Sequence, residues 1–280
     1  MTEKWLIAPG EERVIDIASA SRLKVGLVGG QVDVIAHDEP GVRIEVHGVT
    51  IKDLRVESDG TQIEIDHPQI GWDNFLEVFR NFGTGGPKAE ISIAVPRDIA
   101  LTLGVVSAGA LISGIRNDAK LNTVSGDMIA DGITGDLTAN SVSGDVQVRG
   151  LVGSVVANSV SGDVAVTGTL RKATIDTVSG SVLIDAIGDA NTVNLNTVSG
   201  GVTVRLDETL PANYVLRSIS GKLMVDGIQR SSGGPSNYSG QMGELAGSFV
   251  DVRANTVSGG ITVLRQARPT VADDPEWEES

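Results

Sequence analysis

Aspartates repeated at a fixed spacing are the residues of this chain that could do chemistry. Asp127, Asp145 and Asp163 are evenly spaced, and Asp118 and Asp136 are separated by the same interval. Stacked turns with such carboxylates can bind calcium, as β-roll repeats do. That motif needs two adjacent glycines, a further glycine and then Asp, whereas each half-repeat here offers one glycine and at most one carboxylate. Both series end in neutral or basic residues, so the sequence disfavours calcium and favours two solvated edges.

Histidine, cysteine and serine give little support for catalysis. The three histidines, His37, His47 and His67, precede the repeats, and none has the spacing of a metal-ligand pair. The chain contains no Cys and therefore has neither a thiolate ligand nor a disulfide. Serines recur at equivalent positions, which favours a structural role over one activated nucleophile. We expect no enzyme activity, no cofactor and no resident metal.

A carbohydrate-acting β-helix enzyme is the alternative interpretation of the charged residues. Asp131, Arg149, Asp185 and Arg205 could lie along one long face, where enzymes of that architecture hold acidic and basic groups. Aromatic residues make up only 3% of the chain, so platforms on which a sugar could stack are scarce. The sequence disfavours this alternative.

A short motif positions these residues: an aliphatic residue, Ser, Gly or Ala-Gly, and then a small or polar residue. The motif begins at Val106, Val124, Val142, Val160, Val178, Val198, Ile219 and Val257. The first five copies are evenly spaced, the gap before the last copy is the longest, and a fixed short period indicates a repeat architecture. Gly and Ser favour a corner, and we expect the aliphatic residue of the motif to lie in the core.

Apolar positions after the motif predict the strands. The residues four and six positions after its aliphatic residue are apolar, as in Val146 and Val148, and this spacing of two places them on one face of a strand. The position nine residues on is also apolar in most copies, with Thr169 as the exception. Those apolar residues are Ile115, Ile133, Leu151 and Ile187.

Asparagines before the motif occur in alternate half-repeats only, so one coil spans about 18 residues rather than half that length. They are Asn122, Asn140, Asn158, Asn196 and Asn255, with Asp176 as a variant. In stacked coils they would form a ladder about 4.8 Å apart, in which each amide bonds its neighbours above and below. We expect this ladder to be structural.

The sequence therefore predicts an all-β fold, a single-chain β-solenoid similar to a parallel β-helix, with about 18–20 residues per coil. Residues 1–95 are expected to form a β-rich N-terminal part that caps the solenoid and contains a short helical or irregular insertion near 67–90. Residues 96–265 form the regular solenoid, which strand residues from Ile91 introduce. Residues 266–280 are acidic and predict a disordered tail.

The insertion near 67–90 contains the candidate contact residues. Trp72, Phe75 and Phe79 have the spacing of an amphipathic helical stripe, and Phe82 extends it. One interpretation is a short helix packed over the tube. The other is a contact with a partner, and the acidic residues of the segment make a lipid surface the poorer choice.

A second irregular stretch, 230–247, has two interpretations. Tyr238-Ser239-Gly240 resembles a degraded copy of the motif, while Ser231-Ser232-Gly233-Gly234-Pro235 is typical of a loop. The loop is favoured because Gly247 stands where an apolar residue would be needed.

The net charge and the targeting signals limit the partners and the location that we expect. The formal net charge of −14 argues against nucleic acid and against anionic membrane surfaces. The sequence shows no signal peptide and no apolar stretch long enough to span a membrane. We expect a cytoplasmic location, with surface exposure only through an unrecognised route.

Taken together, the chain resembles the bacterial DUF4097 family, described as putative adhesins or β-strand-repeat proteins. The resemblance rests on Gly29 to Val34, Ile93 to Pro96, the Val-Ser-Gly-Asp-Val coils, and Val250 to Val263. It implies a β-solenoid without a known catalytic site and provides no functional residues. We expect a non-enzymatic scaffold or protein-interaction module, open to a protein partner or to self-association. An exported adhesin or cell-envelope component is the alternative.

Overall fold

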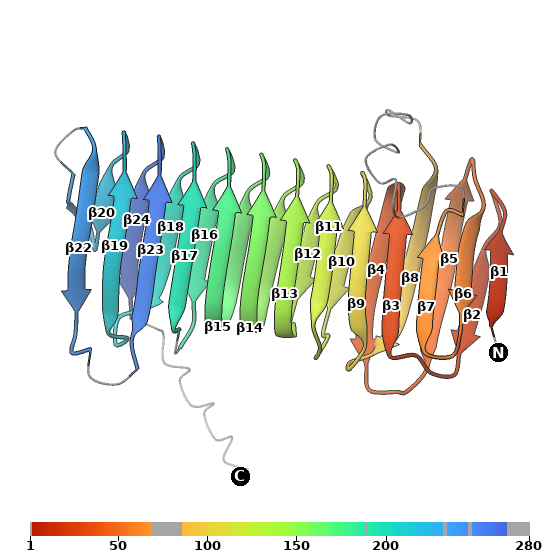
Figure 1. Cartoon of the computed structure of the whole chain (residues 1–280). Coiled ribbons are helices and arrows are strands. Elements are labelled where there is room, and N and C mark those ends of the chain that lie inside the picture. The colour runs from red at the N-terminus through yellow and green to blue at the C-terminus, as the bar shows by residue number, and fades with distance from the viewer. Residues whose placement is uncertain (1, 69–85, 189, 232–233, 246–247, 268–280) are drawn as a thin grey trace, which may run out of the picture.

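The computed structural model describes residues 2–68, 86–188, 190–231, 234–245 and 248–267. These residues form 24 β-strands and no helix. The strands stack side by side along one rod, with the N-terminal strands at one end and β22 (Ser236–Met242) at the other (Figure 1). The predicted all-β solenoid is confirmed.

Strand pairing arranges the chain in two rows, and each coil contributes one strand to each row. The first row, in spatial order, is β1 (Glu3–Ile7), β6 (Leu54–Ser58), β7 (Gln62–Asp66), β3 (Arg22–Leu27), β9 (Ala100–Val105), β11 (Ala119–Thr123), β13 (Thr134–Ser141), the second halves of β14 (Val146–Ser159) and β15 (Val164–Thr177), β17 (Thr192–Thr197), β23 (Val250–Thr256), β19 (Ala212–Ser218) and β22.

The second row faces the first across the core. In the same order it is β2 (Arg13–Ile17), β5 (Val42–Thr50), β8 (Lys88–Pro96), β4 (Gly29–His37), β10 (Gly109–Ser113), β12 (Met128–Asp131), the first halves of β14 and β15, β16 (Val182–Ala186), β18 (Val202–Asp207), β24 (Ile261–Gln266), β20 (Leu223–Val225) and β21 (Ile228–Gln229).

Pairing is parallel through the middle of the rod and antiparallel at both ends. Leu137 pairs with both Ala119 and Val155, its counterparts in the two adjacent copies of the repeat, so the predicted period is the register of the sheet. At the N-terminal end β5 runs antiparallel to β8, and β6 runs antiparallel to β7. At the other end β22 runs antiparallel to β19.

The order of coils in space departs from the order of the chain at both ends. The coil of β3 and β4 lies between that of β7 and β8 and that of β9 and β10. The coil of β23 and β24 lies between that of β17 and β18 and that of β19 and β20. The motif at Val257 therefore lies between those at Val198 and Ile219, and the long gap before this last copy contains the strands β20, β21 and β22.

Residues 236–242 form neither the predicted flexible loop nor a degraded coil. They are strand β22, paired with β19 through seven successive residues without a register shift. Tyr238-Ser239-Gly240 lies inside this strand and not at a corner. Both predictions were wrong for these residues because a strand that covers the end of the stack needs no repeat motif.

Two aliphatic columns from the second row form one side of the core. Side chains on one face of successive parallel strands stack directly above one another, so equivalent motif positions become columns. Four positions after the motif the buried residues are Met128, Val146, Val164, Val182, Val202, Ile261 and Leu223. Six positions after it they are Ala130, Val148, Val166, Ile184, Val204, Val263 and Val225.

The first row supplies the opposite side of the core. Val252 and Tyr214 are consecutive in one of its columns, and Tyr214 is the largest fully buried side chain among the described residues. Its hydroxyl has no hydrogen-bond partner, and burial raises the pKa of Tyr214 to about 12. In spatial order from β11 to β19, the other inward residues on this side are aliphatic, except for a buried Ser or Thr at the end of each strand, as in Thr123, Ser141 and Ser159.

Of the four apolar residues that stand nine positions after the motif, three lie in the core. Ile115, Ile133 and Leu151 are buried, but Ile187 is exposed. The next apolar residue that enters the core after Ile187 is Ala190, because the connection to β17 is longer in this coil. At the other end of the solenoid, β8 begins at Lys88, before the predicted start at Ile91.

Candidate interaction surface

Six aliphatic side chains of the repeat motif project from one edge of the rod. These residues are 44–57% exposed, although apolar side chains are usually buried when a core is available. In spatial order they are Val142, Val160, Val178, Val198, Val257 and Ile219. We call this row the aliphatic ridge. At the strand spacing of about 4.8 Å its five intervals extend over roughly 24 Å.

The prediction that the motif's aliphatic residue lies in the core is wrong along the ridge. Leu137, Ala139 and Ser141 point inward from one strand, and the alternation of side chains then turns Val142 outward. Only at the N-terminal side are the equivalent residues buried, Val106 at 7% and Val124 at 6% exposure.

Beneath the ridge, a buried hydroxyl precedes each exposed aliphatic residue. In the coil of Val160, the N–H of Gly162 donates to Ser159 Oγ at 3.0 Å, and that hydroxyl donates to the carbonyl of Gly162 at 2.8 Å. Thr123 makes the same pair of bonds with Gly126. The hydroxyl closes the corner from inside and holds the next side chain outward.

The serine after each ridge residue donates its N–H to the neighbouring coil, and in every case except Ser220 its hydroxyl donates there as well. Ser161 donates its N–H to the carbonyl of Val142 at 2.9 Å and its hydroxyl to the same oxygen at 3.1 Å. Ser179 repeats this arrangement with Val160. A polar group loses its hydration when a partner covers it. Where the polar groups are already hydrogen-bonded within the protein, removing water from the surface costs little free energy.

The predicted asparagine ladder follows the other flank of the ridge and is confirmed. Asn140 Nδ2 donates to Asn122 Oδ1, and Asn158 Nδ2 donates to Asn140 Oδ1, both at 2.9 Å. Farther along, Asn255 Nδ2 donates to Asn196 Oδ1 at the same distance. The flanks of the ridge are therefore polar but uncharged over most of its length.

The acidic edges act as hydrogen-bond acceptors between coils. The N–H of Asp145 donates to Asp127 Oδ1, that of Asp163 to Asp145 Oδ1, and that of Ser181 to Asp163 Oδ1, at 2.7–2.9 Å. Asp118 accepts from the N–H of Asp136 in the same way. Within the described ranges, no group of three or more His, Asp or Glu could hold a metal ion.

The charged residues considered for catalysis lie in register along one row. Asp131 pairs with Arg149, and Asp185 pairs with Arg205 on neighbouring strands. Arg205 Nη1 is 3.8 Å from Asp185 Oδ2, and both side chains are partly exposed. Facing opposite charges on neighbouring strands are a common stabilising pair.

The histidines are held separately by local contacts. His37 Nδ1 accepts the N–H of Glu39 at 3.0 Å, and His47 Nε2 lies 2.9 Å from the hydroxyl of Ser92. Only His67 is buried.

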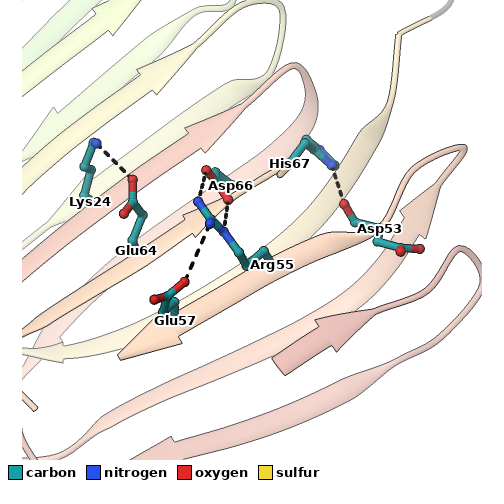
Figure 2. A network of polar contacts seen from close by, with 7 residues as sticks. All are labelled: Lys24, Asp53, Arg55, Glu57, Glu64, Asp66 and His67. Atoms are coloured by element: carbon teal, nitrogen blue, oxygen red, sulfur yellow. Dashed lines mark hydrogen bonds and ion pairs between the residues drawn. The ribbon is translucent and has the colours of Figure 1, made fainter. Parts of the chain in front are cut away.

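His67 lies beside a polar network near the N-terminal end of the rod (Figure 2). Its Nδ1 is 3.1 Å from the carbonyl oxygen of Asp53, and its buried Nε2 has no hydrogen-bond partner. Burial lowers the pKa of His67, because charging the ring would require solvation that the site does not offer. The neutral ring is the form that fits this site.

The adjacent Asp66 is neutralised by Arg55. Arg55 Nε and Nη2 donate to the two carboxylate oxygens of Asp66 at 2.7 and 2.6 Å, a bidentate pair (Figure 2). Glu57 lies 3.6 Å from the same guanidinium, and the hydrogen bond to Asp66 raises the pKa of Arg55. On the next strand, Lys24 donates to Glu64 at 2.9 Å. The network ties β6 and β7 to β3.

The aromatic residues predicted to contact a partner, Trp72, Phe75, Phe79 and Phe82, lie outside the described residues. Most of the predicted tail, 268–280, lies outside them as well. Among the described residues, no helix is long and apolar enough to cross a membrane.

The comparison with protein families agrees with the architecture. The model of the family described as Toastrack DUF4097 matches residues 21–264. A search of curated proteins finds no match.

Three crystal structures resemble the chain over most of its length. One is described as a "putative lipid binding protein" from Parabacteroides distasonis, with 14% identity, coverage of 91% of this chain and 96% of the other, and a TM-score of 0.46. A "putative adhesin" from Bacteroides fragilis has 14% identity, 91% and 98% coverage, and a TM-score of 0.41. A "putative cell adhesion protein" from Clostridium sporogenes has 10% identity, 95% and 99% coverage, and a TM-score of 0.25.

The family model covers nearly all of the strand-forming chain, from β3 to β24, including the two coils that lie out of chain order. The chain belongs to the Toastrack DUF4097 family.

Proposed function

We propose that this protein is a non-enzymatic β-solenoid scaffold that binds a protein partner along the aliphatic ridge. The observation that carries the proposal is the ridge itself, six exposed aliphatic residues in one line on an edge whose backbone is already hydrogen-bonded. Contiguous exposed apolar surface on a polar background is typical of interaction sites.

The chemistry of the ridge favours a protein over other ligands. Of the aromatic residues in the described ranges, Trp5, Tyr214, Tyr238 and Phe249, none belongs to the ridge, so it offers no stacking platform for a sugar. The net charge of −14 opposes the phosphates of nucleic acids. A partner segment that presents its own line of apolar side chains would bury the valines without leaving buried polar groups unpaired.

Substitution of ridge valines by threonine tests the proposal. Val142, Val160 and Val178 are replaced together, which keeps side-chain shape and β-branching but removes the apolar surface. We expect the folded state to be retained, since these side chains are already exposed, and the amount of partner captured from the native host to fall at least tenfold. Capture is scored on a partner that is then purified and shown to bind directly.

A matched control uses Val152 and Val156, which are exposed on β14 away from the ridge. Their replacement by threonine should leave capture unchanged. Equal binding by the ridge variant and the wild type would refute the proposal.

Location separates this proposal from the exported adhesin that the sequence left as an alternative. A cytoplasmic location is part of the proposal, and fractionation of the native host tests it. Recovery of the protein outside the membrane would favour the adhesin.

A further inference from the structure

In the part of the chain that the structure describes, the outer edge of β22 at the end of the rod pairs with no further strand. Among the described residues β22 pairs only with β19, and Figure 1 shows it as the outermost strand of that end. In such an edge strand alternate N–H and C=O groups point away from the sheet without a partner. Seven residues paired without a bulge keep this edge straight.

The composition of β22 lacks the features that protect other edges of this molecule. Its sequence, Ser-Asn-Tyr-Ser-Gly-Gln-Met, has no charged residue and no proline. At the opposite end β1 carries Glu3 and Lys4, and β2 carries Arg13 and Asp16. Charges on edge strands oppose pairing with another chain, so of the described edge strands β22 is better suited to such pairing than β1 or β2.

Apolar side chains at the same end would gain from being covered. Tyr238 and Met242 pack against the end of the core and are only partly buried. In the second row, Ile228 of β21 is 53% exposed. Contact with another surface would remove these three side chains from water.

Charge also favours this end for contact between copies of a strongly acidic chain. Residues 205–266 contain six Lys and Arg against five Asp and Glu, whereas residues 2–66 contain seven against thirteen. Two N-terminal ends would repel each other, whereas the described strands at the β22 end are close to neutral; the acidic segment 273–279 that follows them lies outside the described residues.

We propose that β22 pairs antiparallel with β22 of a second copy, so that two rods join end to end in a two-fold symmetric dimer. An antiparallel pair of identical strands is self-complementary, as a two-fold interface requires. Ser239, the middle residue of β22, then faces Ser239 of the second copy, and Asn237 faces Gln241. The axis lies perpendicular to the sheets, so it also brings the two copies of Ile228 to the same junction. Unlike the ridge proposal, this inference concerns contact between copies and stands without it.

Because the chain contains no cysteine, a single engineered cysteine reports this contact without background. Ser239→Cys should give a disulfide-linked dimer on mild oxidation, because directly opposed residues of an antiparallel pair bring their Cβ atoms within about 4.5–5.5 Å. Neither Asn237→Cys nor Gln241→Cys should link to itself, but a mixture of the two should. Thr169→Cys, exposed in the middle of the rod, is the control for random collision.

Sedimentation measures the association without a cross-link. The wild type should pass from monomer to dimer as its concentration rises, and Ser239→Lys, which opposes two charges at the axis, should stay monomeric with an unchanged melting temperature. A wild type that is monomeric at every soluble concentration would overturn the proposal. So would Ser239→Cys linking no faster than Thr169→Cys, or linking to Leu6→Cys of β1 instead of to itself, which would indicate head-to-tail filaments.

Discussion

At the scale of single residues, neighbouring side chains of the repeat motif have opposite surroundings. Ser159 is buried and bonded to Gly162, whereas Val160, one residue later, is 49% exposed. A polar group in the core and an apolar group in water both cost free energy unless something compensates. The hydroxyl is compensated by the corner that it closes, and the proposed partner would compensate the valine.

His67 gives a prediction about pH. Its folded-state pKa is lowered by burial, so the unfolded chain binds the proton more readily than the folded chain. The stability contributed by the neutral ring should be fully present above about pH 6.5 and should be lost as the pH falls below that value toward the folded-state pKa. The measurement is the free energy of unfolding in urea from pH 8 to pH 5, for the wild type and for His67→Gln.

The surroundings of His67 and a second histidine provide the controls. Asp66 opposes the pKa shift and Lys52 adds to it, but both are present in every variant, so the difference between wild type and His67→Gln isolates the ring. His47→Gln serves as the matched substitution, because it removes an exposed imidazole of β5 and leaves the buried ring of His67 in place. An identical pH dependence in His67→Gln and the wild type would contradict the prediction.

The exposure of the ridge residues could have been predicted from the sequence. The sequence analysis instead placed them in the core, and the reason is physical. The inward positions Leu137 and Ala139 fix the phase of the strand, and a period of two continues to Ser141, not to Val142. Hydrophobicity alone assigns Val142 to the core. Only the alternation of the preceding strand, extended through a polar residue, places it outside.

At the scale of the element, each corner depends on a glycine that touches the corner below. A Cβ at Gly162 would lie 2.0 Å from the carbonyl oxygen of Gly144, and one at Gly180 equally close to that of Gly162. These glycines are required by the spacing between coils rather than by a left-handed backbone. The contact recurs because the register between coils is constant.

Gly200 and Gly201 allow a matched test of this contact. A Cβ at Gly200 would lie 1.9 Å from the carbonyl oxygen of Gly180, while one at Gly201 would meet nothing within 4 Å. Gly200→Ala should lower the free energy of unfolding by about 3 kcal/mol or more, since a backbone oxygen cannot move aside without shifting the coil. Gly201→Ala should change it by less than about 0.5 kcal/mol. Equal melting curves for the two variants would exclude the contact as a determinant of stability.

The elements show which parts of the fold the sequence could predict. The repeat period, the inward columns and the asparagine ladder follow from local repetition, and all three are present in the pairing. The position of β23 and β24 inside the stack does not, because motifs at Val198, Ile219 and Val257 are equivalent and any order satisfies them locally. Only the complete set of strand pairings distinguishes those orders.

At the scale of the whole molecule, each of the two out-of-order coils pairs with a neighbouring coil on both sides near an end of the rod. Repeat proteins often fray from their termini, since a terminal repeat has one neighbour. Here β23 and β24, close to the end of the described chain, have neighbours on both sides. Distance along the chain from the terminus is therefore a poor guide to local stability.

Hydrogen exchange tests this arrangement. Backbone amides of residues 250–266 should be protected as strongly as those of β17 and β18, and far more strongly than those of β22, which pairs on one side only. The measurement is native-state exchange followed by mass spectrometry of overlapping peptides. Protection that decreases steadily from residue 192 to residue 266 would show that the final coil frays like an ordinary terminal repeat.

The inserted final coil also constrains how the chain folds as it is made. A ribosome releases β19 and β20 before β23 and β24 exist, yet in the finished rod the later coil separates them from β17 and β18. A nascent chain that stacked each coil on the previous one would place Ile219 directly upon Val198 and close the space reserved for Val257. Completion of this end must therefore wait until β23 and β24 have been released, or reverse a premature stacking, while the coils before residue 200 can assemble as they emerge.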